Sequence, residues 1–193
     1  MAQDQSSDRD DAPRKWVNLV SWTALAFAIL IAALVVRERV GLDDLLPGRD
    51  AAGLPAPGAT APDIAAVNAD GALISLSDFQ GQPVWLNFWG AWCPPCRAEI
   101  PDMIRAYDAA KERGVVLVAV SLDEPSEEAF DYATKVGMDF IVLSDPNRAA
   151  IEGKYRVRTF PTHIFIDRDG VVREVVLTTM STGTALNKVE SIT

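Results

Sequence analysis

The sequence predicts an α/β domain in which helices cover both faces of a central mixed sheet. Two runs, 84–89 and 115–121, are almost entirely apolar, as expected for central strands covered on both sides. Segments with helical spacing alternate with these runs, and a hairpin pattern closes the domain. With 193 residues, the chain has room for one domain of ordinary size and an appendage.

The composition argues against several classes of function. The formal net charge of −9 disfavours nucleic-acid binding, which needs clustered lysine and arginine side chains. Two cysteines cannot form a framework of structural disulfides, and with one histidine they are too few for a structural zinc site. No phosphate-binding glycine loop is present. We therefore expect no metal and no bound cofactor, and we interpret the two cysteines as a redox-active pair.

The N-terminal region predicts a membrane anchor. Residues 1–15 are polar and are expected to form a disordered tail. Residues 16–36 carry no charge over 21 positions, which is long enough for a transmembrane helix. A cleaved signal peptide is the alternative, but Arg37-Glu38-Arg39 follows the apolar run in place of a cleavage site. We therefore expect the anchor to stay attached.

The flanking charges do not orient this span, because three basic residues precede it and three follow it. A dithiol pair with an exchange role suits an oxidising compartment. We therefore predict a cell-membrane protein with a cytoplasmic N-terminus and an extracytoplasmic domain. Residues 37–61 are rich in proline, glycine and alanine and predict a linker, so the folded domain is expected at 62–193.

The first half of the domain predicts a hairpin, a central strand and a helix. Residues 64–67 and 73–76 flank a four-residue turn signal and form an extra N-terminal hairpin. After the strand at 84–89, a helix is expected to begin at Pro95 and to run to Arg113. Pro101 lies inside this helix and predicts a kink.

The second half predicts alternating elements followed by a terminal hairpin. The expected elements are a strand at 115–121, a helix at 126–136, a strand at 140–143, a short helix at 147–155, a hairpin of 162–167 with 171–177, and a short helix at 184–192.

The cysteine motif, Trp92-Cys93-Pro94-Pro95-Cys96, falls at the predicted strand-to-helix turn. The free N–H groups and the dipole of a helix N-terminus favour a thiolate there. We assign Cys93 as the attacking thiolate and expect it to be the better exposed of the two. Cys96 would then resolve the mixed disulfide, which is the chemistry of a dithiol–disulfide exchanger.

The chain resembles the thioredoxin-fold proteins in three places. Phe88 to Cys96 is similar to their active-site strand and turn, and Pro101 matches the proline of their active-site helix. The segment 155–162 resembles the one that carries their cis-proline, which would be Pro161. Asn87 and Thr159 depart from the common thioredoxin pattern.

Further features are similar to the membrane-anchored TlpA/ResA/DsbE-like thiol reductases. These features are the leading apolar span, the extra hairpin, Arg97-Ala98-Glu99 and Phe165-Ile166-Asp167. The resemblance covers residues 62 to about 177 and implies a thioredoxin-like fold with a redox-active disulfide as its only redox group. It implies reduction of disulfides in client proteins, of the cytochrome c or copper-site maturation type. The electrons would come from a membrane thiol reductase.

The resemblance also implies roles for individual residues. Glu99 lies one turn after Cys96 and would accept or deliver its proton; a solvated glutamate that complements the helix dipole is the alternative. The expected client-contact residues flank the disulfide in the turn and in the cis-proline segment. They are Trp92, Pro94, Pro95, Phe160 and Pro161.

Three other functions remain open at this stage. A thiol oxidase would use the same two cysteines in the opposite direction. A copper-delivery module would use Cys93, Cys96 and His163, although a structural histidine on a strand is the simpler interpretation of His163. A peroxidase is a weaker alternative, because Cys93 lies within a tight two-cysteine turn.

Overall fold

The computed structural model describes residue 31 and residues 53–193. The predicted tail at 1–15, the predicted membrane span at 16–36 apart from Ile31, and the linker up to residue 52 lie outside the described residues. Within the described part of the chain, no helix is both long and apolar enough to cross a bilayer.

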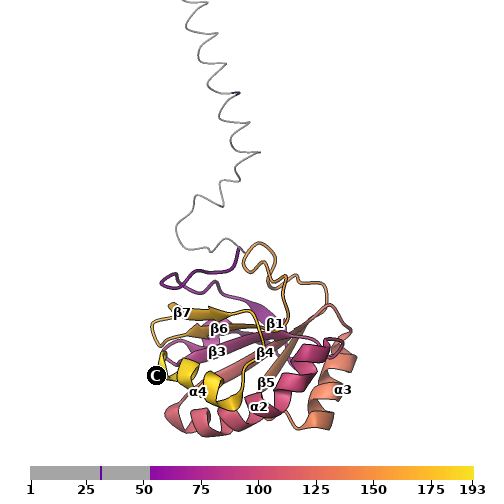
Figure 1. Cartoon of the computed structure of the whole chain (residues 1–193). Coiled ribbons are helices and arrows are strands. Elements are labelled where there is room, and N and C mark those ends of the chain that lie inside the picture. Colours follow the sequence, from indigo (N-terminus) through magenta and orange to yellow (C-terminus); the bar gives the residue numbers. More distant parts are fainter. Residues whose placement is uncertain (1–30, 32–52) are drawn as a thin grey trace, which may run out of the picture. The chain divides into compact units, whose positions relative to one another are not determined.

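The described part of the domain is built on one mixed sheet of seven strands, in the order β2-β1-β5-β4-β3-β6-β7 (Figure 1). Central strand β3 pairs in parallel with β4 and antiparallel with β6, so the predicted mixed sheet is confirmed. The strands are β1 (Ala65–Val67), β2 (Leu73–Ser75), β3 (Val84–Trp89), β4 (Val116–Leu122), β5 (Ile141–Asp145), β6 (Thr162–Ile166) and β7 (Val172–Val176).

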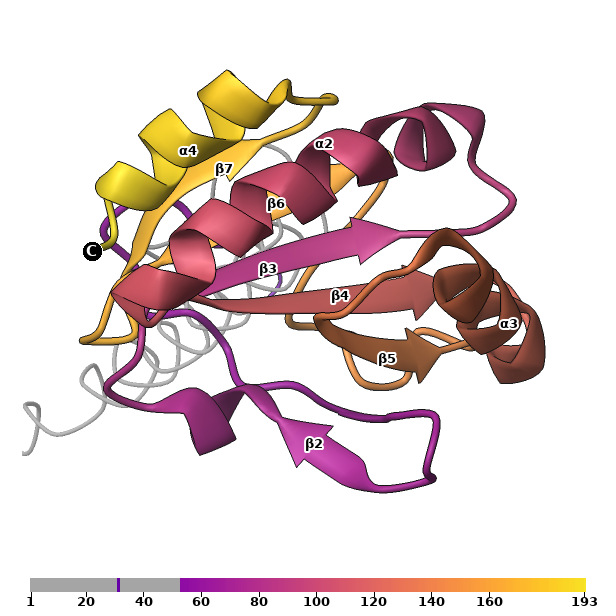
Figure 2. The ribbon, with the colours of Figure 1, turned by 90° about the horizontal axis from the view of Figure 1, so that it is seen from below.

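The α-helices of the described domain contribute to one core, on a single face of the sheet. They are α2 (Pro94–Ala110), α3 (Ser126–Val136) and α4 (Thr182–Glu190). Each packs at least one buried side chain against Trp85 and its neighbours in this core. Figure 1 shows the three helices below the strands, and Figure 2 shows them in front of the sheet. The prediction that helices cover both faces is therefore wrong for the described domain.

Largely non-helical chain covers the other face. Leu54 and Ile64 come from the segment 53–64, and Ile151, Tyr155 and Val157 come from a second segment. Together with the short 3₁₀ helix η2 (Leu76–Phe79), whose Leu76 and Phe79 are partly buried there, these side chains close the core over β3 and β4.

The folded domain begins earlier than residue 62, the predicted boundary. Thr60 forms a β-bridge with Val171, and the Gly58 N–H donates to the Val172 carbonyl. The end of the predicted linker packs on the domain because Leu54 is apolar and finds a buried site.

The predicted short helix at 147–155 does not form. Arg148 and Gly153 have positive φ values of 58° and 68°, which a right-handed helix does not allow. Arg148 instead donates from its guanidinium to the Val157 carbonyl and to Asp123. Contacts with residues outside this segment therefore override its helical pattern.

The remaining elements agree with the sequence within a few residues. The hairpin of β1 and β2 is confirmed, as is the terminal hairpin of β6 and β7. Helix α2 begins one residue before the predicted start, because Pro94 suits the first helical position. Pro101 lies inside α2, and the helix continues through η3 (Lys111–Arg113) to Gly114, which ends it with a φ of 79°. Helix α4 begins at Thr182, after the N-cap Ser181.

Candidate active site

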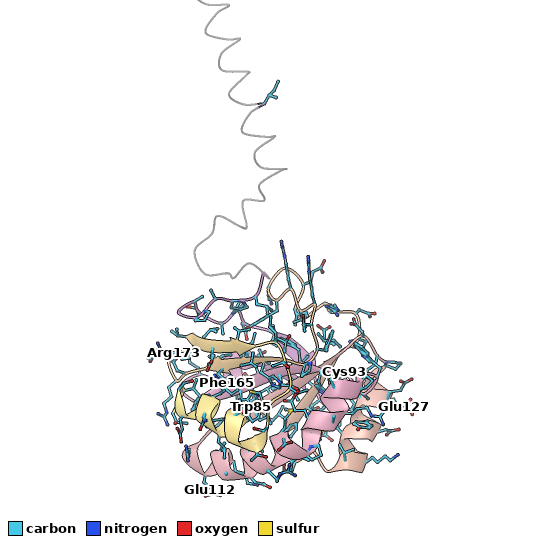
Figure 3. The ribbon with its side chains drawn as sticks, in the orientation of Figure 1. Trp85, Cys93, Glu112, Glu127, Phe165 and Arg173 are labelled. Carbon is cyan, nitrogen blue, oxygen red and sulfur yellow. A yellow bond between two sulfur atoms is a disulfide. The ribbon has the colours of Figure 1, made fainter. Side chains whose placement is uncertain are left out.

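Cys93 and Cys96 form a disulfide at the N-terminus of α2. Cys93 is the N-cap residue, and the Cys96 N–H donates to its sulfur at 3.3 Å. Pro94 and Pro95 lie between them and offer no N–H to either sulfur. Figure 3 shows Cys93 at this end of α2, with Trp85 in the interior of the domain. The predicted position of the pair at a strand-to-helix turn is therefore confirmed.

The expectation that Cys93 is the better exposed sulfur is wrong for the disulfide form. Both residues are only 2% exposed, because they join the core under α2. Pro94 and Pro95 are exposed, whereas Phe160 packs against the same core from the cis-proline segment. Both sulfurs are therefore recessed between the turn and this segment.

The peptide bond between Phe160 and Pro161 is cis, as the sequence resemblance implies. The Thr162 hydroxyl donates to the Thr159 carbonyl at 2.6 Å and holds the bend. Strand β6 then pairs with β3, whose end leads into the cysteine turn, so the proline segment lies at the same end of the sheet.

Trp92 links the cysteine turn to its surroundings. Its indole N–H donates to the Leu122 carbonyl at 2.9 Å, and its ring meets Phe160 edge-on with centroids 5.1 Å apart. The side chain is 48% exposed, so it offers an apolar surface beside the disulfide. Gly90 is required beneath it, because a Cβ there would lie 2.3 Å from the indole nitrogen.

Arg148 also contacts the ring of Phe160, and no sequence pattern pointed to it. Its guanidinium carbon is 5.5 Å from the ring centroid, and its Nε donates to Asp123 at 2.7 Å. This hydrogen bond lowers the pKa of Asp123 below its usual range. Asp123 and Arg148 therefore form an ion pair next to Phe160, at the rim of the site.

Glu124 is a buried carboxylate behind the cysteine turn. Its two oxygens accept the Ala91 N–H at 2.9 and 3.0 Å, and one also accepts the Ser121 hydroxyl. Glu124 therefore ties the turn after β3 to the end of β4. One sequence signal could have pointed to Glu124, because it follows closely on the apolar run that forms β4. Strands β3 and β4 are parallel, so their carboxyl ends meet at the same edge of the sheet.

Glu99 is buried at 3% exposure, which contradicts the solvated alternative for its role. Its Oε1 lies 2.9 Å from His163 Nε2, although the N–H is not aligned for a hydrogen bond. His163 is a fully buried residue of β6, as the structural interpretation expected. Asn87 is a buried amide that reaches His163 Nδ1 at 3.0 Å.

The surroundings of His163 bear on the copper alternative. Trp85 and Asn87 approach one ring nitrogen of His163, and Glu99 faces the other. Neither nitrogen is directed at a free site. In the described residues, no group of three or more histidine, cysteine or acidic side chains is arranged to hold a metal ion.

Residues 57–175 match the model of the AhpC/TSA family. The chain belongs to the AhpC/TSA family. It is 36% identical over 135 residues to the thiol-disulfide oxidoreductase ResA of Geobacillus kaustophilus, covering 70% of this chain and 77% of the relative. It is 37% identical over 124 residues to ResA of Bacillus subtilis, covering 64% of this chain and 69% of that protein.

A solved structure from Chlorobium tepidum, described as a DsbE-type thiol:disulfide interchange protein, superposes with a TM-score of 0.64. Sequence identity is 32%, and the match covers 72% of this chain and 99% of that one. This AhpC/TSA member is therefore a ResA/DsbE-like thiol:disulfide oxidoreductase with a thioredoxin-like fold. The fold, the enzyme class and the disulfide at Cys93 and Cys96 agree with the sequence prediction.

Proposed function

We propose that this oxidoreductase reduces disulfides of client proteins on the extracytoplasmic side of a cell membrane, to which residues 16–36 anchor it. The observation that carries the proposal is the disulfide of Cys93 and Cys96 at a helix N-terminus, opposite cis-Pro161. The uncharged run of 21 residues supports the anchor. The orientation rests on the preference of dedicated exchange dithiols for an oxidising compartment.

The reaction begins from the reduced dithiol. The Cys93 thiolate attacks one sulfur of the client disulfide, and the other client sulfur leaves as a thiolate. Cys96 then loses its proton to Glu99 and attacks the Cys93 sulfur. The second client thiolate leaves, and the Cys93–Cys96 disulfide seen here is the product. Two electrons pass from the dithiol to the client, whose thiolates take protons from water.

Client contact is assigned to the turn and the cis-proline segment. Trp92 presents an exposed apolar ring, and Pro94 and Pro95 are exposed beside it. Phe160 and Pro161 would lie against an extended client segment, whose backbone groups can pair with chain next to a cis-proline. The recessed sulfur favours clients that present their disulfide on an extended segment.

The two prolines of the motif favour the reducing direction. A strongly oxidising pair owes its potential to a stabilised reduced form. Among the described residues, the Cys96 N–H is the one group that donates to the Cys93 sulfur, and the prolines supply no donors. We expect a reduction potential near that of thioredoxin, about −270 mV. A value near about −120 mV would instead support the thiol oxidase.

Clients of the cytochrome c or copper-site maturation type, and a membrane thiol reductase as electron donor, are supported by the resemblance to TlpA/ResA/DsbE-like proteins. The test is a trapping experiment with Cys96→Ala in membranes. We expect the client to remain bound to Cys93 as a mixed disulfide, with Cys93→Ala, which retains only Cys96, as the matched control. Recovery of the same adducts with Cys93→Ala would refute the assignment of Cys93 as the attacking thiol.

A further inference from the structure

A buried polar cluster lies under α2 behind the disulfide. It consists of Trp85 and Asn87 from β3, His163 from β6 and Glu99 from α2. All four are at most 3% exposed, in a layer otherwise filled by apolar side chains. Burial of polar groups costs free energy unless they are partnered, so the arrangement of the cluster calls for a function.

The neighbours of His163 fix its protonation. The indole N–H of Trp85, which can only donate, points to Nδ1 at 3.2 Å. Nδ1 must therefore be the acceptor, and the proton of the neutral ring resides on Nε2. The Asn87 amide nitrogen lies 3.0 Å from the same Nδ1. A second proton on Nδ1 would face these donors, so His163 acts as a fixed donor from Nε2.

That donor faces Glu99. His163 Nε2 lies 2.9 Å from Oε1, and neither carboxylate oxygen has an aligned hydrogen bond among the described residues. Among the charged groups on the adjoining elements, Glu174 of β7 and Lys188 of α4 pair with each other. The imidazole N–H is therefore the main support available to a charged Glu99.

We propose that His163 is a positioning residue that favours the carboxylate form of Glu99 in the reduced protein and holds it for proton exchange with the thiol of Cys96. In the resolution step, the proton moves from the Cys96 thiol to Glu99 as the Cys96 sulfur bonds to Cys93. When a dithiol donor reduces the disulfide again, Glu99 returns that proton to the Cys96 thiolate. The inference rests on the proposed role of Glu99 and deepens it by naming the group that sets its charge.

The reaction of the reduced protein with the aromatic disulfide DTNB separates the two steps. Attack by Cys93 releases one coloured thiolate, and resolution by Cys96 releases a second. With His163→Leu, we expect the midpoint of the pH–rate profile of the second phase to rise by about one unit, because the carboxylate loses the polar ring nitrogen that lies 2.9 Å from it. The first phase is expected to keep its profile.

Three variants control this result. His163→Gln retains an N–H donor and is expected to restore the midpoint. Ile164→Val, a buried change on the opposite face of β6, is expected to leave both phases unchanged. In a Glu99→Gln background, His163→Leu is expected to have no further effect on the second phase, since the two residues act as one unit.

A measurement on the unaltered protein is independent of folding effects. His163 is the single histidine of the chain, so its ring ¹⁵N signals are unambiguous in an untagged protein. We expect Nε2 protonated and Nδ1 unprotonated at pH 7, because Nδ1 accepts from the Trp85 indole. A proton on Nδ1 would overturn the inference. If Glu99→Gln leaves the rate of the second phase unchanged, the proposed role of Glu99 is overturned. If Glu99→Gln changes this rate but His163→Leu does not shift its pH midpoint, only the role of His163 is overturned.

Discussion

Replacement of Glu124 by alanine tests whether the carboxylate behind the cysteine turn holds it in place. The change removes the acceptor for the Ala91 N–H and for the Ser121 hydroxyl. Leaving a buried polar group unpaired costs about 1–3 kcal/mol. Ser121 is fully buried, but the half-buried Ala91 N–H can recover water in part. We therefore expect the free energy of unfolding to fall by about 2–4 kcal/mol.

The assay is urea denaturation of the oxidised protein, with Glu128→Ala as the matched control. Glu128 is an exposed glutamate in the first turn of α3, so its loss is expected to change the free energy of unfolding by less than about 0.5 kcal/mol. Exchange with DTNB is expected to slow in Glu124→Ala, because the turn that presents Cys93 is no longer tied to β4. A loss of stability below about 1 kcal/mol would refute the assigned role, since it is less than the cost of one unpaired group.

Two further predictions concern the motif and its rim. Pro94→Gly adds an N–H near Cys93. The pH midpoint for thiolate formation, followed by ultraviolet absorbance, is therefore expected to fall, and the reduction potential to become more oxidising. An unchanged or higher midpoint contradicts the argument that the prolines withhold hydrogen-bond donors. Asp123→Asn removes a carboxylate whose pKa is lowered mainly by its hydrogen bond to Arg148. That carboxylate stabilises the fold above its unfolded pKa, and the contribution is lost as pH falls through the folded pKa. At pH 7 we expect the variant to be less stable by about 0.5–1 kcal/mol, as for a largely exposed ion pair. The difference is expected to shrink below about pH 4 in denaturation curves recorded across pH, and a difference that persists at pH 2 contradicts this cause.

Local sequence pattern was sufficient to predict most of the helices and strands and the reactive cysteine pair. The strand at 84–89 and the helix at 126–136 match β3 and α3 residue for residue. The cysteine turn was also predicted, because its two prolines restrict the backbone. The cis-proline at 161 was predicted from the resemblance to thioredoxin-fold proteins and is confirmed. In contrast, the helix expected at 147–155 failed, since distant partners hold Arg148 in a conformation that a helix does not allow.

The contacts of the residues around the sulfurs could be recognised only from the tertiary structure. The hydrogen bonds that Glu124 accepts from the cysteine turn require the ends of β3 and β4 to lie together. The tautomer of His163 follows from Trp85, which is far away in the sequence. The recessed position of Cys93 likewise depends on Phe160, which reaches the site from the proline segment.

By itself, the sequence determined where a disulfide-exchange pair would lie, because two cysteines separated by two prolines after an apolar strand fix both the reactive atoms and their place at a helix start. Only the tertiary structure decided which face of the sheet the helices cover, how far the sulfurs are recessed and which groups face Glu99. Sequence periodicity records whether a side chain is buried, whereas the identity of its neighbours depends on contacts between distant segments, which a local pattern does not contain.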